Sequence, residues 1–251
     1  MRIENSFIGV RGVGETTERR LWTNGVTHWE EFDGSIVGRT LAARIESYIE
    51  EGWDRLDRGD LGYFADGLPT SSRWRLYENA VDEACFLDIE TTGLDAPRHE
   101  VTTVSVHQDG HTRTFVNGRD LTAERLDEEL SGAGLLVTFN GRRFDVPFLE
   151  TCFDLEVDVP HLDLMYPCQR LDLRGGLKRI ERDVGIERDR PDISGRDAVR
   201  LWHEYERGDE RALETLVSYN RADTVNLQTL AEEVVERLDR QMFDPVHSTD
   251  R

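Results

Sequence analysis

The stretch CFLDIETTGL, residues 85–94, places two carboxylates, Asp88 and Glu90, at the end of an apolar run. Side chains two positions apart on a strand point to the same face of the sheet. Two like charges held this close repel each other, and burying them is costly unless a cation lies between them. The pair therefore either faces open solvent or holds a metal ion.

Two further acids follow apolar segments. Asp145 ends the segment TFNGRRFD, after a second strand-like run, and Asp223 lies in the helical segment SYNRADTV. Acids at several strand ends of an open α/β fold can converge on one site. Mg²⁺ prefers carboxylate and water oxygens, and a pair of such ions can activate water in phosphoryl transfer. We therefore expect the four acids to form a divalent-metal site, although any one of them alone is more simply a solvated side chain.

Tyr219 precedes Asp223 by four residues, so on a helix the two side chains share one face. A phenol beside a metal site can orient a water molecule or accept its hydrogen bond. A tyrosine in an amphipathic helix core has the same spacing. The spacing alone leaves both interpretations open.

Taken together, DIET, NGRRFD and YNRAD resemble the three motifs of DEDD-type 3′–5′ exonucleases, which have a ribonuclease H-like fold. The correct order of the three motifs is much more specific than any one of them. Ser218 stands where the alternative subclass has histidine, so the chain resembles the tyrosine subclass (DEDDy). The segments WRLY, HLDL, GGLKRIE and YNRADTVNL are similar to the YprB-like branch, and the resemblance covers residues 72–240.

This resemblance implies a metal-dependent exonuclease that hydrolyses DNA or RNA from a single-stranded 3′ end and releases nucleoside 5′-monophosphates. It implies two Mg²⁺ or Mn²⁺ ions, one shared by Asp88, Glu90 and Asp145 and the other held by Asp88 and Asp223. Tyr219 would position the attacking water. The corresponding fold is an α/β fold, a ribonuclease H-like mixed sheet flanked by helices.

The resemblance also implies residues that contact substrate. Those expected near the terminal nucleotide and its backbone are Thr91, Thr92, Leu94 and Asn140. Independently of the resemblance, basic residues cluster near the proposed site: Arg142 and Arg143 in the second motif, with Arg170, Arg174, Lys178 and Arg179 downstream. They either contact phosphate or form a solvated surface, which is the more common role of a basic run. We interpret Asp163 and His161 in HLDL as structural, with support of the site by Asp163 as the alternative.

Two other functions remain open. One is a nucleic-acid-binding subunit that keeps the fold but does not cut, and the other is a structure-specific endonuclease on the same fold. The presence of all four acids and Tyr219 argues against loss of catalysis, since nothing structural requires four convergent acids. The sequence does not distinguish DNA from RNA, because two-metal chemistry does not involve the 2′-hydroxyl.

The elements that must position these residues are predicted from periodicity. ACFLDIE, VTTVSVHQDG, HTRTFVNG, GLLVTFN and VPHLDLM are strand-like, with a hairpin at Asp109-Gly110. LTAERLDEELSGA, FDVPFLETCF and the long segment 214–241 are helical, so we expect a mixed sheet covered by helices. The predicted organisation is a helical N-terminal region at 1–71, the ribonuclease H-like domain at 72–241 and a flexible tail at 242–251.

Within the N-terminal region, helices are predicted from Thr16 to Trp22 and over 38–58. A capping box at Thr27 and Glu30 predicts another helix start. GDLGYFADGLPTSS is interpreted as a connector and RWRLYENA as a short helix. The turn Gly12-Val13-Gly14 resembles half of a helix-hairpin-helix, in which backbone amides bind a phosphate; a plain helix cap is the alternative.

Composition places further bounds on the chain. It has 51 acidic and 31 basic residues, a net charge of −20, and only one lysine beside its arginines. We interpret this as a halophilic surface, since molar salt shortens the Debye length to ~3 Å and so permits a polyanionic partner. The three cysteines, distant from one another, are expected to be buried free thiols. Without an apolar run of membrane-span length or a signal peptide, the expected location is the cytoplasm.

Overall fold

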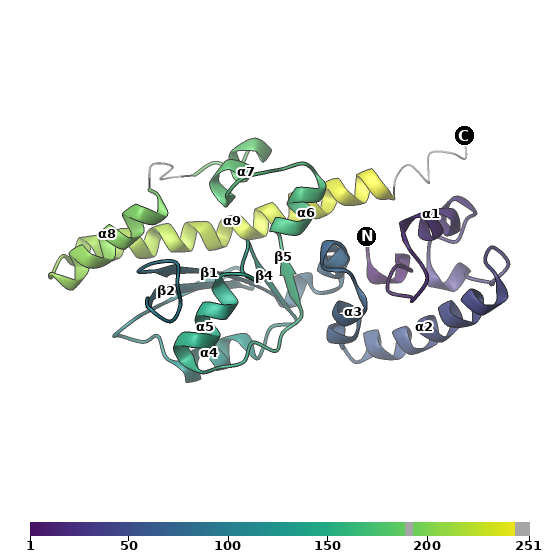
Figure 1. Cartoon of the computed structure of the whole chain (residues 1–251), viewed down its shortest axis with the longest axis horizontal. Coiled ribbons are helices and arrows are strands. Elements are labelled where there is room, and N and C mark those ends of the chain that lie inside the picture. Colours follow the sequence, from purple (N-terminus) through teal and green to yellow (C-terminus); the bar gives the residue numbers. More distant parts are fainter. Residues whose placement is uncertain (189–192, 244–251) are drawn as a thin grey trace. The chain divides into compact units, whose positions relative to one another are not determined.

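The structure is a computed structural model that describes residues 1–188 and 193–243 (Figure 1). It divides into two units, Met1–Val81 together with Val234–Arg251, and Asp82–Glu233. The division expected from sequence, between residues 71 and 72, stays a prediction. The predicted tail at 242–251 lies outside the described residues from position 244 onward.

The first unit is helical. Its helices are α1 (Glu15–Thr23), α2 (Arg39–Asp57) and α3 (Leu61–Gly67), with 3₁₀ turns at Ile3–Asn5, Trp29–Glu31 and Thr70–Asn79. Helices α1 and α2 match the predicted ones. The connector prediction was wrong, because Asp60 caps the start of α3 by accepting a hydrogen bond from the Tyr63 backbone (3.2 Å). The predicted short helix in RWRLYENA forms as part of the last 3₁₀ turn.

The capping box falls one residue later than predicted. Glu31, not Glu30, accepts hydrogen bonds from the backbone N–H groups of Thr27 (2.7 Å) and His28 (2.9 Å). His28 is the cap, and it begins a single 3₁₀ turn instead of an α-helix. The turn directs Trp29 into the core, where the residue is 2% exposed.

A glycine inside α2 makes room for the Trp29 ring. Glycine inside a helix costs about 1 kcal/mol relative to alanine. A Cβ at Gly52 would lie 2.7 Å from Trp29 Cη2, inside van der Waals contact. The close approach of α2 to Trp29 therefore explains why this helix has glycine at position 52.

A buried ion pair stabilises the N-terminal segment. Glu18 on α1 and Arg75 are both fully buried, with Arg75 Nη1 2.6 Å from Glu18 Oε1. The same carboxylate oxygen accepts hydrogen bonds from the Ser6 hydroxyl and from the backbone N–H groups of Phe7 and Ile8. Arg75 also lies over the rings of Trp22 and Trp74. The pair therefore links three segments of this unit.

We expect Arg75→Met to destabilise the first unit by about 3–5 kcal/mol, because it leaves the Glu18 carboxylate buried without its counter-charge. Guanidinium unfolding followed by tryptophan fluorescence measures this, since four of the five tryptophans lie in residues 1–81. Arg55→Met is the control. It removes exposed ion pairs with Glu51 and Asp60 and should cost less than about 1 kcal/mol. Equal losses in the two variants would contradict a stabilising role for the buried pair.

The second unit contains a five-stranded mixed sheet. Its strands are β1 (Ala84–Thr91), β2 (Val101–Gln108), β3 (His111–Val116), β4 (Leu135–Thr138) and β5 (His161–Asp163), in the order β3-β2-β1-β4-β5. The β1–β2 and β2–β3 pairs are antiparallel, and β1–β4 and β4–β5 are parallel. Asp109 (φ 51°) and Gly110 (φ 72°) form the predicted hairpin turn. The predicted α/β class and mixed sheet are confirmed.

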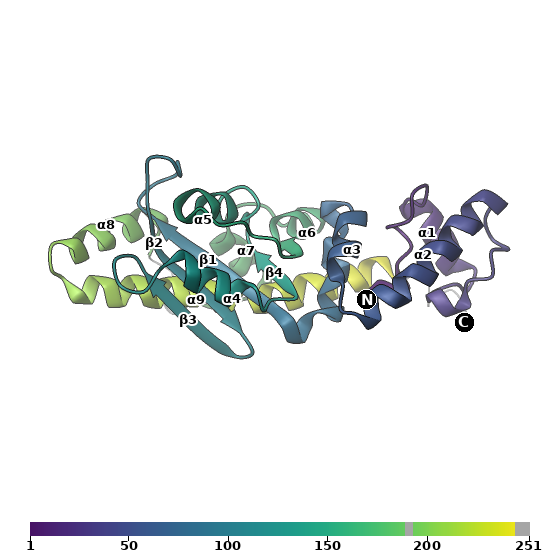
Figure 2. The ribbon, with the colours of Figure 1, turned by 90° about the horizontal axis from the view of Figure 1, so that it is seen from below.

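Helices cover both faces of this sheet (Figures 1 and 2). They are α4 (Ala123–Leu130), α5 (Asp145–Phe153), α6 (Met165–Arg170), α7 (Leu177–Val184), α8 (Gly195–Glu206) and α9 (Glu210–Met242). Cys85, Leu87 and Ile89 of β1 pack in one core with side chains of α4 and α5. Alternation along the strand therefore turns Asp88 and Glu90 to the opposite face, toward α9.

The three cysteines are free, as predicted. Cys85 and Cys168 are buried, and burial raises the pKa of each thiol to about 12. Cys152 is exposed, so the expectation that all three are buried was wrong for this residue.

None of the helices in the described ranges has the length and hydrophobicity of a membrane span.

Candidate active site

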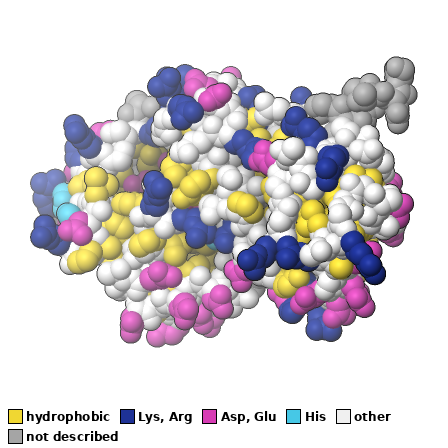
Figure 3. All heavy atoms as spheres, turned by 45° about the vertical axis from the view of Figure 1, so that its right-hand side comes forward, with side chains coloured by type: hydrophobic (Ala, Val, Ile, Leu, Met, Phe, Trp, Pro, Cys, Tyr) yellow, Lys and Arg dark blue, Asp and Glu magenta, His cyan; other side chains and the backbone are white. Residues whose placement is uncertain are grey.

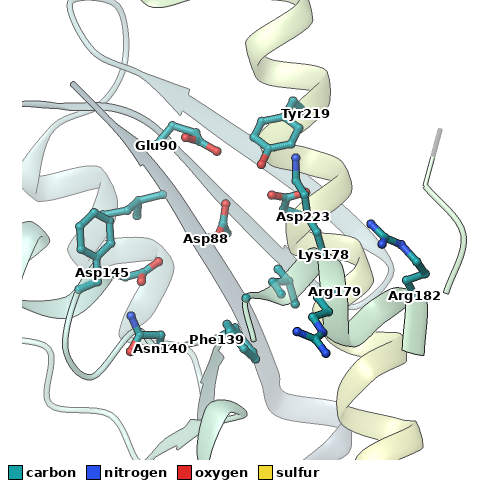
Figure 4. A pocket seen from close by; sticks show the side chains of 14 residues that line it. Asp88, Glu90, Phe139, Asn140, Asp145, Lys178, Arg179, Arg182, Tyr219 and Asp223 are labelled. Atoms are coloured by element: carbon teal, nitrogen blue, oxygen red, sulfur yellow. The ribbon is translucent and has the colours of Figure 1, made fainter. Parts of the chain in front are cut away.

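Three carboxylates meet between the end of β1 and the middle of α9. One oxygen each of Asp88, Glu90 and Asp223 lies within 4.8 Å of the others. Figure 4 shows Asp145 on the other side of Asp88, at the first turn of α5. All four acids line one cavity of about 490 Å³. The structure thus brings together the acids that the sequence places far apart.

Neighbouring residues on α9 hold this arrangement. The side chain of Asn220 donates hydrogen bonds to Asp88 Oδ2 (2.7 Å) and to the Asp88 carbonyl (3.2 Å). Asn220 is fully buried. Its spacing of three from Asp223 places both side chains on the face of α9 that meets β1. Helix α9 therefore supplies one acid and fixes the orientation of another.

The site is short of positive charge. Burial, with the nearby charges of Asp223 and Asp145, raises the pKa of Glu90 from its ordinary value of 4.5 to about 8. Burial also raises the pKa of Asp145 to about 7. Burial and the charges of Asp223 and Glu90 raise the pKa of Asp88, and burial raises that of Asp223 despite the opposing effect of Arg188. A cluster of this kind is stabilised either when some of its carboxylates are protonated or when it binds a cation.

These residues fit a divalent metal site. Carboxylate oxygens are the ligands that Mg²⁺ and Mn²⁺ take, and a buried cluster of like charges is stabilised by a cation at its centre. The grouping favours Asp88, Glu90 and Asp223 as ligands of one ion. The predicted set of Asp88, Glu90 and Asp145 stays a prediction, since Asp145 lines the same cavity on the other side of Asp88.

Tyr219 lies beside the carboxylates and also in the core. Its ring packs in a buried cluster with Leu213 and Leu216, so the core interpretation holds. It also lines the cavity, where Figure 4 shows it between Glu90 and Asp223. Burial and the charges of Asp223 and Glu90 raise the pKa of its phenol, so the hydroxyl stays protonated.

The single lysine of the chain lies in this cavity. Lys178 Nζ is 4.6 Å from the centroid of the Tyr219 ring and, among the described residues, has no hydrogen-bond partner. Burial lowers its pKa, opposed by the charges of Asp223 and Glu90. Arg179 and Arg182 of α7 line the cavity beside it (Figure 4). The four acids therefore line one part of the cavity, and Lys178, Arg179 and Arg182 line another part, which we call the basic wall.

The second motif forms a turn that lines part of the cavity. Asn140 has a left-handed backbone (φ 65°) and lines the cavity beside Phe139. Asp163 accepts hydrogen bonds from the backbone N–H groups of Asn140 (2.7 Å) and Arg142 (3.2 Å). His161 lies 2.8 Å from the Thr138 hydroxyl. Asp163 and His161 are thus structural, and Asp163 positions the turn that carries Asn140.

Most of the other residues predicted to contact substrate lie outside the cavity lining. The hydroxyl of Thr91 donates to the Gly93 carbonyl (2.6 Å), and that of Thr92 accepts from the Glu100 backbone (3.0 Å). Leu94 is 86% exposed. Of the arginines that sequence suggested, Arg142, Arg143 and Arg174 are exposed and Arg170 is partly exposed, whereas Arg179 is exposed but lines the cavity. Their substrate roles stay predictions.

The predicted phosphate-binding turn is at the start of α1. Gly12 has φ 100°, Val13 is buried, and Gly14 is the residue before the helix. Residues 1–11 contain one 3₁₀ turn and no α-helix. The turn therefore lacks the first helix of a helix-hairpin-helix, and its phosphate-binding role stays a prediction.

Sequence reasoning missed Asn220 and Arg182 at the site itself, and Arg188, which forms ion pairs with Asp223 and with Glu181 on α7. Asn220 had a usable signal, because it lies on the same helix face as Asp223. Arg182 also had a usable signal in the sequence, since it lies one helical turn from Lys178. Arg188 follows the end of α7 and shows no periodic relation to any motif, so nothing in the sequence indicated it.

The fold agrees with the comparisons to known proteins. The sequence profile of the RNase H superfamily matches residues 85–235, which include all four acids and Tyr219. The chain therefore belongs to the RNase H superfamily and has an RNase H-like nuclease fold. No curated protein sequence matches the chain.

Solved structures show the same fold at low identity. A family B DNA polymerase from the hyperthermophilic archaeon Pyrobaculum calidifontis is 20% identical, with a TM-score of 0.50 over 66% of this chain and 27% of the polymerase. Brucella melitensis NrnC bound to pGG is 20% identical, with a TM-score of 0.46 over 68% of this chain and 81% of NrnC. At this identity the likeness to the polymerase shows a shared fold and nothing further.

The raised pKa values predict how the metal-free protein responds to pH. A carboxylate whose pKa is higher in the folded state destabilises the fold as it ionises, so stability should fall as pH rises. Ionisation of Glu90 lowers stability between its ordinary pKa of 4.5 and its raised pKa of about 8. The loss of stability due to Asp145 is complete near its raised pKa of about 7. We expect the melting temperature in chelator to be higher at pH 6 than at pH 8.5, and saturating Mg²⁺ to reduce the difference.

Differential scanning calorimetry of wild type and of Glu90→Gln/Asp145→Asn measures this effect. The double variant removes the two titrating groups and should show a much smaller fall. An equal fall in both proteins would assign the pH dependence to groups outside the site.

Proposed function

We propose that this protein is a metal-dependent 3′–5′ exonuclease that hydrolyses phosphodiester bonds of DNA or RNA. The observation that carries the proposal is the meeting of Asp88, Glu90 and Asp223 within 4.8 Å, with Asp145 lining the same cavity. No structural requirement of the fold explains four acids whose burial raises their pKa values. A phosphodiester substrate and divalent ions explain both the acids and the basic wall.

Divalent ions bound to these acids would lower the pKa of a water molecule and offset negative charge on the reacting phosphate. Asp88, Glu90 and Asp223 would hold one ion, with Asp145 and Asp88 available to a second. Asn220 keeps the Asp88 carboxylate oriented through its 2.7 Å hydrogen bond. The protonated Tyr219 hydroxyl would hold the attacking water in line with the phosphate.

The basic wall suits the phosphate backbone. Lys178, Arg179 and Arg182 lie along α7 on the side of the cavity opposite Asp145 (Figure 4). Arginine and lysine bind phosphate oxygens without reading base sequence. The net charge of −20 does not exclude this contact, because charge is unevenly distributed. Figure 3 shows acidic and basic side chains gathered in separate groups on the face in view.

The apolar part of the cavity suits a terminal nucleoside. Phe139, Phe144 and Leu177 line it beside the carboxylates. Aromatic side chains stack on bases of any sequence, with about 1–3 kcal/mol for each base. We propose that the 3′-terminal base packs here and that Asn140, Thr91, Thr92 and the exposed Leu94 contact the terminal nucleotide.

Incubation with 5′-labelled single-stranded DNA and RNA, in Mg²⁺ and in Mn²⁺, tests the proposal. An exonuclease with this direction produces a ladder that shortens from the 3′ end, releases nucleoside 5′-monophosphates and leaves closed circular strands intact. Cutting of circles would favour an endonuclease. Binding of either nucleic acid without cleavage under any ion would favour a non-catalytic binding subunit.

A further inference from the structure

Arg188 joins the carboxylate site to a second buried acid. Its Nη1 lies 2.6 Å from Asp223 Oδ1, and its Nε donates a hydrogen bond to Oε2 of Glu181 on α7. The side chains of Arg188 and Asp223 are each 7% exposed, and Glu181 is fully buried. One guanidinium therefore bridges two buried carboxylates, and one of them is a candidate metal ligand.

The end of α7 brings Arg188 to this position. Gly185 ends the helix in a left-handed conformation (φ 87°), and the Ile186 N–H bonds back to the Glu181 carbonyl (2.8 Å). The chain turns back on itself, so Arg188 lies beside Glu181, seven residues earlier. Glu181 thus anchors the guanidinium independently of Asp223.

Arg188 supplies the charge that the carboxylates lack. Arginine stays protonated at all pH values that proteins encounter, so its charge is permanent. Among the described residues, Arg188 is the one cation that forms an ion pair with the group of Asp88, Glu90 and Asp223. Lys178 Nζ makes no hydrogen bond there, and Arg182, which lines the same cavity, is exposed and without an ion pair.

We propose that Arg188 is a built-in counter-cation that holds Asp223 in the metal-free protein and competes with a divalent ion for this carboxylate. The inference rests on the divalent-ion site proposed above. Because a fixed positive charge next to the site repels a cation, Arg188 weakens ion binding and makes occupancy depend on ion concentration. When the ion takes Asp223, Glu181 keeps the guanidinium paired and avoids a buried unpaired charge.

Titration with Mn²⁺ alone tests this without substrate. Calorimetry gives the Kd, and the spin-resonance signal of free Mn²⁺ gives the number of ions bound, for wild type, Arg188→Gln and Arg182→Gln. We expect Arg188→Gln to bind Mn²⁺ about tenfold more tightly than wild type and to melt at a lower temperature in chelator. Arg182→Gln removes an equal charge from a residue that lines the carboxylate cavity, without freeing Asp223, so its Kd should change much less.

Unchanged or weaker Mn²⁺ binding in Arg188→Gln overturns the inference, since Arg188 would then position Asp223 or serve packing alone. An equal gain in Arg182→Gln also overturns it, because net charge would then be sufficient. Arg188→Gln leaves Glu181 unpaired, so Arg188→Gln/Glu181→Gln carries the same test if the single variant does not fold. Tight binding to wild type with no gain in either variant rejects only the competition, whereas no binding to any protein rejects the proposed metal site as well.

Discussion

Asp88→Asn is expected to abolish divalent-ion binding and to reduce phosphodiester hydrolysis by about a thousandfold or more. Asp88 is the central acid of the site, because Glu90 and Asp223 lie on one side of it and Asp145 on the other. An amide in its place keeps the shape and can still accept the hydrogen bond of Asn220. The substitution therefore removes the charge and leaves the surrounding packing in place.

A stability measurement separates this loss from misfolding. Because burial and like charges raise the pKa of Asp88, replacing it removes repulsion, and the metal-free variant should melt at or above the wild-type temperature. Asp127→Asn is the matched control, since Asp127 is exposed on α4, away from the cavity. Wild-type Mn²⁺ binding by Asp88→Asn in calorimetry would remove the carboxylate site from the mechanism.

Tyr219→Phe is expected to lower turnover about a hundredfold while leaving substrate affinity nearly unchanged. The phenylalanine ring keeps the packing against Leu213 and Leu216 and the contact with Lys178 Nζ. The variant therefore removes only the hydroxyl. Since the raised pKa keeps this hydroxyl protonated, it acts by orienting water and not as a base, and the loss should be similar at all working pH values.

Single-turnover cleavage gives the rate, and binding of a labelled strand in Ca²⁺ gives the affinity. Tyr205→Phe on α8 is the matched control, because its hydroxyl accepts a hydrogen bond from Arg119 (3.0 Å) and it does not line the cavity. Cleavage by Tyr219→Phe at the wild-type rate would show that Tyr219 serves the core alone.

Much of the fold can be predicted from local patterns. The alternation in ACFLDIE predicts β1, Asp109-Gly110 predicts the hairpin, and the periodicity of 38–58 predicts α2. These patterns are readable because each depends on residues a few positions apart. Predictions failed where short polar signals compete, as in the connector that forms α3 and in the capping box displaced from Glu30 to Glu31.

The candidate site could be predicted because its residues lie in ordered motifs. The sequence alone indicates that Asp88 and Glu90 share a face of one strand and that Tyr219 and Asp223 share a face of one helix. It does not indicate which acids group together. The packing of α9 against β1 groups Asp223, and not Asp145, with Asp88 and Glu90.

By itself, then, the sequence determined the identity of the acids, the strand and helix that carry them, and the surplus of negative charge that they share. Tertiary structure decided how that charge is balanced. Arg188 reaches Asp223, 35 positions away, only because α7 ends at Gly185 and the chain turns back to Glu181. A contact of this kind leaves no periodic pattern in the sequence, because its geometry depends on how whole helices and strands pack together.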